Sequence, residues 1–222
     1  MVQVLNLQGT LPILSSPILS NFTSLDCLTL MGTPMDIIQY ITFIPKNLRI
    51  LIIILDVKVL NSLHIYNNDP NLLNSIIPDP TQRVQCIRIV CNKMVLLTRL
   101  NTLLRRQKRR SITNLGHLLN TIFKRFYFNL KAIELSKIDF IIIFQHPIYC
   151  KDFPKLGIVL LDGVSGNSLD AWRHVVQNHY IILVNDTLSG GLYTIYPSGI
   201  GFWTTTNTSR HIANIRKNMG FI

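Results

Sequence analysis

The sequence predicts an α/β fold with a central parallel sheet, and three observations lead to this expectation. Apolar runs rich in Ile, Leu and Val recur along the chain and are typical of strands buried on both faces. Stretches with helical spacing of apolar residues separate these runs. The 222 residues are enough to bury a core between layers of secondary structure. Because crossover connections are right-handed, this alternation favours parallel βαβ units.

Short apolar runs supply the expected strands. Leu48–Leu55 is the most apolar of them, is too short to span a bilayer and ends at Asp56. Pro147 ends the run at 140–144. The predicted strands are 48–55, 84–90, 140–144, 156–161 and 180–184.

Helices are expected between the strands. Ser168 is a good N-cap, with Asp170 in the first turn of the helix that follows. Met31–Pro45 is predicted to be a loop or a short helix. The predicted helices are 56–66, 94–104, 116–130, 168–178 and 207–217. They complete a three-layer sandwich of the flavodoxin or Rossmann-like type.

The first 30 residues contain Pro12 and Pro17 and show no clear period. An irregular N-terminal arm is therefore predicted for residues 1–30, followed by a single α/β domain at residues 31–222. The first basic residue is Lys46, so the start lacks the pattern of a transit or signal peptide.

The charge balance is strongly basic. Lys and Arg number 22 against 11 Asp and Glu, a net charge of +11, although only 15% of residues are charged. RNA is the simplest partner for such a chain, because cations that neutralise phosphates release counterions. An anionic membrane surface is the second candidate. Codon bias explains the many Ile and Asn residues but not the scarcity of carboxylates.

The densest basic feature is the run Arg105–Arg110, which has five cations in six residues without an interleaved carboxylate. A solvated helix end explains part of it, but contact with phosphates explains the density better. Phe123, Phe126, Tyr127 and Phe128 follow nearby, where core packing is favoured over base stacking. The predicted RNA-binding residues are Arg99, Arg105, Arg106, Lys108, Arg109, Arg110, Lys124, Arg125, Arg210, Arg216 and Lys217.

Patterns for catalysis, metal binding or cofactor binding are weak. The turn at 162–167 joins a strand to a helix, but it is not GxGxxG, and no GxxxxGK[ST] occurs. Asp162, Asp186 and His174 have the residue types of a catalytic triad, but no nucleophile motif supports one, since neither Ser165 nor Ser189 lies in a GxSxG elbow. The sequence thus predicts no catalytic residue, metal or cofactor. Cys27, Cys86, Cys91 and Cys150 lack metal-ligand spacing and are expected to be free thiols.

From Leu156 onward the chain resembles ribosomal protein S-two of the small subunit. That family has a strand ending in Asp, a helix bearing Ala, a strand ending like L-V-D-T, then Tyr-Pro and an Asn before the last helix. The corresponding residues are 160–162, Ala171, 183–187, 196–197 and Asn207.

The earlier part of the chain fits the family more loosely. Residues 52–60 look like its I-I-D-L-x-K-T-L, residues 88–93 like its F-V-G-T-K, and residues 116–120 like its G-G-L-L-T-N. The family's Trp before the glycine pair is absent, extra residues precede Asn207, and Asn185 interrupts V-D-T. The coiled-coil hairpin is reduced to about 121–136.

This resemblance implies a non-enzymatic scaffold on the solvent side of the small subunit, near the head–body junction. The expected partners are small-subunit rRNA and neighbouring ribosomal proteins, which in bacterial relatives include S-one, S-three, S-five and S-eight. It implies neither membrane insertion nor a homo-oligomer. Composition and divergence favour an organelle-encoded protein of the mitochondrial ribosome. The alternatives are a nucleotide-binding flavodoxin-like enzyme using the turn at 163–168 and a peripheral membrane protein.

Overall fold

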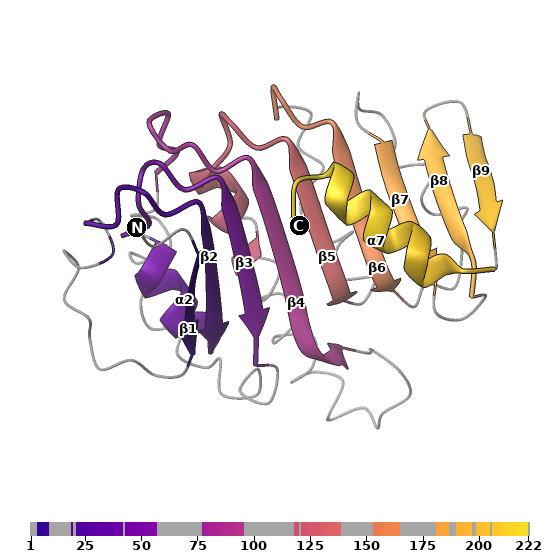
Figure 1. Ribbon diagram of the computed structural model, residues 1–222, viewed down its shortest axis with the longest axis horizontal. Helices are drawn as coiled ribbons and strands as arrows, with labels where there is room; N and C mark the ends of the chain where they lie inside the picture. Colours follow the sequence, from indigo (N-terminus) through magenta and orange to yellow (C-terminus); the bar gives the residue numbers. More distant parts are fainter. Residues whose placement is uncertain are drawn as a thin grey trace, which may run out of the picture.

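The fold is an α/β arrangement built on one mainly parallel sheet (Figure 1). The computed structural model describes residues 4–8, 19, 21–41, 43–56, 77–95, 118–119, 121–138, 153–164, 181–186, 190–196, 199–204 and 206–221. The strands are β1 (Val4–Gln8), β2 (Cys27–Gly32), β3 (Ile50–Leu55), β4 (Cys86–Val95), β5 (Ala132–Ile138), β6 (Ile158–Val164), β7 (Ile181–Asp186), β8 (Leu192–Tyr196) and β9 (Gly199–Thr204).

These strands lie side by side in the order in which they occur along the chain. Strands β1 to β7 are parallel, and β8 and β9 extend the sheet as an antiparallel ribbon. A doubly wound sheet reverses its strand order at a switch point, where its ligand crevice forms. The described strands have no such reversal, so their order differs from the one expected for a flavodoxin-like or Rossmann-like sheet.

One face of the sheet carries the main core. Alternate strand residues such as Leu51 and Ile53 are fully buried there. Helix α2 (Pro34–Ile41) packs on this face through Ile37 and Ile38, and the helical residues 118–119 and 121–125 add further apolar side chains. Burial of this continuous apolar surface is the main force that stabilises the fold.

The opposite face is covered over its middle strands by helix α7 (Thr208–Asn218), which crosses in front of the sheet in Figure 1. Ile212 and Ile215 of α7 form a second apolar cluster with Ala132, Leu160 and Leu183 of the strands below. Sequence spacing explains this contact, because residues three apart lie on one face of a helix.

Both helices have recognisable end signals. Thr33 and Asp36 form a reciprocal capping pair: the Asp36 amide donates to Thr33 Oγ1 at 3.3 Å, and the Thr33 amide donates to Asp36 Oδ2 at 2.9 Å. Helix α7 ends at Asn218, and Gly220 follows the C-cap residue Met219 with a φ of 85°, which favours glycine. The Phe221 amide then donates to the Arg216 carbonyl at 3.0 Å.

Most expected elements that fall on described residues are confirmed. Strands β3, β4, β6 and β7, the short helix α2 and the last helix α7 occupy the predicted places within a few residues. Strand β4 continues to Val95, through the predicted start of a helix at Met94. The remaining helix predictions at 57–66, 96–104 and 168–178, and the strand at 140–144, lie outside the described residues.

Three expectations were wrong. The arm at residues 1–30 is not irregular where β1 and β2 form, because both pair in the sheet. The stretch 121–136, interpreted as a reduced hairpin, holds a helix end and most of β5. Strands β8 and β9 lie between the predicted strand 180–184 and the predicted helix 207–217, where no strand or helix was expected.

Cys91 offers a test of the core. Burial raises the pKa of its thiol from 9.0 to about 12, which lowers the thiolate fraction near neutral pH by about a thousandfold. We expect iodoacetamide to alkylate Cys91 only after unfolding, as measured by peptide mass spectrometry. Cys27, which is only half-buried, is the internal control and should react sooner. Equal rates at both thiols in the folded protein would contradict this packing.

Candidate functional site

The predicted RNA-binding residues fall into three groups. Arg99 and the run at 105–110 lie outside the described residues, so their role stays a prediction. Lys124, Arg210 and Lys217 are exposed, the first on the helical segment before β5 and the other two on α7. These three side chains are accessible to a polyanion.

Arg125 and Arg216 form the third group, since both contact acceptors within the protein. The Nη2 atom of Arg125 lies 3.3 Å from Asp79 Oδ2, and its Nη1 atom donates to the Ile77 carbonyl at 2.9 Å. These contacts fasten the helical segment before β5 to the loop before β4. An RNA phosphate would have to displace them to bind Arg125.

Arg216 joins α7 to a buried carboxylate on the sheet. Glu134 of β5 has no exposed surface, and it accepts from Arg216 Nε at 3.0 Å and from Arg216 Nη2 at 2.6 Å. The Arg88 Nε atom lies 3.1 Å from the same carboxylate, and Ser136 Oγ donates to it at 2.8 Å.

Asp162 of β6 completes this ionic network. It accepts from Arg216 Nη2 at 2.5 Å and from Asn185 Nδ2 at 2.7 Å. Desolvation lowers the pKa of Arg216, but the hydrogen bonds and charges of Glu134 and Asp162 outweigh it, so that the pKa is raised. The network pairs two arginines with two carboxylates, which makes it a charge-balanced cross-link between α7 and the sheet.

The structure describes only the first part of the predicted turn at 162–167. Strand β6 continues through Val164, and Gly163 takes a φ of 66°. The Asp162 carboxylate accepts hydrogen bonds from two side chains, so it is part of the network with Arg216. Ser165, His174 and Ser189 lie outside the described residues.

The aromatic residues before β5 divide between core and surface. Phe123 and Phe126 are buried in the main core, which confirms packing for these two. Phe128 is 39% exposed, and its ring packs edge-on against Tyr127 with centroids 5.2 Å apart. Of this group, Phe128 is the one most available to a nucleic-acid base.

A further set of cations lies at the amino ends of four neighbouring strands. Lys46, Arg83, Lys131 and Lys155 precede β3, β4, β5 and β6, and all four are exposed. We call these four residues the basic edge. The sequence did not predict them as a site, although a signal was present: a cation lies within four residues before each of these apolar strands.

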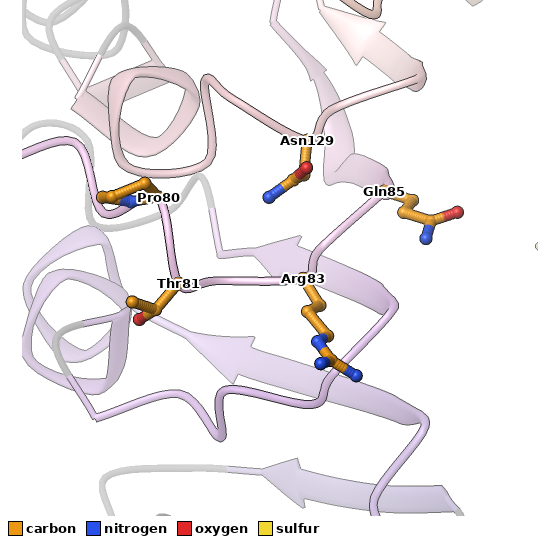
Figure 2. Close-up of a pocket in the computed structure, with 5 residues that line it drawn as sticks. All are labelled: Pro80, Thr81, Arg83, Gln85 and Asn129. Carbon is orange, nitrogen blue, oxygen red and sulfur yellow. The ribbon is translucent and has the colours of Figure 1, made fainter.

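Two hollows open at the basic edge. The larger has a volume of about 570 Å³ and is lined by Pro80, Thr81, Arg83, Gln85 and Asn129 (Figure 2). The smaller, of about 290 Å³, is lined by Lys131, Arg49 and residues at the end of α7, and it shares Gln85 with the first. Polar side chains and Arg83 thus surround the larger hollow, whereas apolar residues such as Ile50 and Ile158 form much of the lining of the smaller one.

Hydrogen bonds fix the rim of the larger hollow. Asn129 Nδ2 donates to the Gln82 carbonyl at 2.7 Å, and Lys155 Nζ donates to Asn129 Oδ1 at 2.7 Å. The Asn129 amide therefore links the loop before β4 to the lysine before β6. In Figure 2, Asn129 and Arg83 lie on facing segments of this rim.

Searches of family models, curated proteins and solved structures found no match to this chain. Among the described residues, no group of three or more His, Cys, Asp or Glu side chains is placed to hold a metal ion. No helix in the described part of the chain is long and apolar enough to cross a membrane.

Proposed function

We propose that the protein is a structural component of the small subunit of a mitochondrial ribosome, where it contacts rRNA and neighbouring ribosomal proteins. The observation that carries this proposal is the placement of charge. The chain has a net charge of +11, and exposed cations lie at the amino ends of four consecutive strands, where a polar hollow also opens. Such a surface suits a partner bound mainly through phosphates.

The resemblance to the S-two family gains support from the order of the elements. The residues that resemble L-V-D-T lie at the end of β7, Tyr196 ends β8, and Asn207 immediately precedes α7. The proposal includes the three-layer sandwich that the family implies. Apolar packing on both faces of the sheet supports it, by α2 on one side and α7 on the other.

A nucleotide-binding enzyme is less well supported. Its phosphate site would need the turn after β6, and a doubly wound sheet would place that site at a strand-order reversal. The described strands run in chain order, and Asp162 is held in the network with Arg216. Both observations favour a structural role for this end of the sheet.

Sedimentation tests the proposal. A tagged copy of the chain, made in the cells that encode it, should co-sediment with the small subunit when mitochondrial lysate is separated on a sucrose gradient. High salt or nuclease should release it, because phosphate contacts weaken with salt. A matrix protein of similar mass serves as the control for non-specific co-sedimentation with the small subunit. A chain found only at the top of the gradient at low salt would contradict the proposal.

A further inference from the structure

We propose that the basic edge of the sheet binds the phosphodiester backbone of RNA, with one cation supplied before each of the strands β3 to β6. This proposal rests on the proposed function and names the surface through which it would operate. It differs from the sequence prediction, in which the run at 105–110 and α7 carried the contacts.

Backbone hydrogen bonds hold the basic edge as one rigid row. The Arg83 amide donates to the Lys46 carbonyl at 3.1 Å. The Lys131 amide donates to the Gln85 carbonyl at 2.7 Å, and the Gly157 amide donates to the Lys131 carbonyl at 2.9 Å. Because neighbouring strands lie about 4.8 Å apart, the backbone segments that carry these cations are close neighbours. A backbone held in this way loses little conformational freedom when it binds a polyanion.

The nearby carboxylates do not cancel this charge. Asp26 is bonded to Arg49 through Oδ1 and Oδ2, and this hydrogen bond is the main cause of its lowered pKa. Asp79 accepts from the Thr81 amide at 2.9 Å and forms an ion pair with Arg125, so its negative charge is also balanced by an arginine. No carboxylate in the described part of the chain pairs with Lys46, Arg83, Lys131 or Lys155. The surface is therefore positive overall.

The concave shape and the polar lining favour RNA over a bilayer. Gln85 and the second N–H of the Asn129 amide group lie beside Arg83, and such groups commonly contact phosphate and sugar oxygens. A hollow of about 570 Å³ admits a phosphate and its ribose, whereas a bilayer surface meets mainly the outermost groups. The lysine that Asn129 holds at the rim adds charge next to these donors.

The experiment compares two variants that each remove one positive charge from the same strand. K131Q neutralises a lysine of the basic edge, just before β5, and K137Q neutralises an exposed lysine at the other end of β5. Binding of the purified chain to a fluorescein-labelled RNA stem-loop is measured by anisotropy over a range of salt concentrations. Circular dichroism and thermal unfolding confirm that both variants fold.

We expect K131Q to weaken binding about threefold at moderate salt. The slope of log K against log salt should fall by about 1 for each phosphate that the variant no longer neutralises. K137Q should change both quantities much less. Equal losses of affinity in the two variants would overturn the basic edge as the binding surface while leaving RNA binding, and so the proposed function, in place. If the wild-type chain does not bind the RNA but floats with phosphatidylserine vesicles, both proposals are overturned.

Discussion

Replacing Phe123 by alanine is expected to lower the free energy of unfolding by about 4 kcal/mol. Phe123 is among the largest fully buried side chains, and it packs in the main core between the helical segment 121–125 and the sheet. Its truncation removes favourable transfer free energy and leaves a cavity that the surrounding sheet cannot close. For a chain of this size the melting temperature should fall by roughly 10 °C.

Phe128 is the matched control, because it is the same residue type five positions later and is 39% exposed. Phe128→Ala should change the free energy of unfolding by less than about 1 kcal/mol. Urea titration followed by circular dichroism gives both values. If Phe128→Ala proved as costly as Phe123→Ala, the division of these aromatics into core and surface would be wrong.

Replacing Arg216 by alanine is expected to lower the free energy of unfolding by about 3 kcal/mol. The change leaves Glu134 fully buried with Arg88 as its remaining cationic partner, and it removes the bond that joins α7 to Asp162. Breaking one side of a buried ion network is costly because the other charge stays desolvated. The last helix should loosen first, which hydrogen exchange of the α7 amides would detect.

Two control variants distinguish the loss of the Arg216 contacts from the loss of a positive charge alone. Arg216→Lys keeps the charge but not the planar set of donors, so it should retain only part of the stabilisation that the Arg216 contacts provide. Arg210→Ala removes an exposed cation from the same helix and should have little effect. An Arg216→Ala protein as stable as wild type would show that the contacts with Glu134 and Asp162 do not secure α7.

The sequence predicted strands best where apolar residues were continuous. Strand β3 is a run of Ile and Leu, and β7 is an apolar run followed by Asn185 and Asp186. Strand β5 was missed because Glu134 and Lys137 interrupt its pattern. The structure explains the first of these, since Glu134 is neutralised by arginines from β4 and α7, and a local pattern cannot show such partners.

The two antiparallel strands were missed for a different reason. Strands β8 and β9 include two glycines and two threonines, and Phe202 and Trp203 of β9 are exposed. An edge strand such as β9 depends on pairing with its neighbour more than on burial. Their existence therefore follows from β7, on which the ribbon is built.

The residues of the basic edge were not predicted from the sequence. Net charge favoured a polyanion as the partner, and Lys124, Arg210 and Lys217 are exposed, but their contact with RNA stays a prediction. Arg125 and Arg216 have the same chemistry but contact carboxylates that are distant in sequence. The basic edge was overlooked because its members are single cations separated by tens of residues, and only the sheet brings them into one row.

The consecutive strand order bears on how this protein forms. Each strand pairs with the one made just before it, so the sheet can grow at one side while the chain is still being synthesised. Helix α7 comes last and supplies the arginine for a carboxylate 82 residues earlier. Until it emerges, Glu134 lacks one of its two arginine partners, and Ala132 and Leu160 lack the cover of α7. A nascent chain halted before α7 would therefore hold apolar sheet residues without this helix, the kind of surface that chaperones bind.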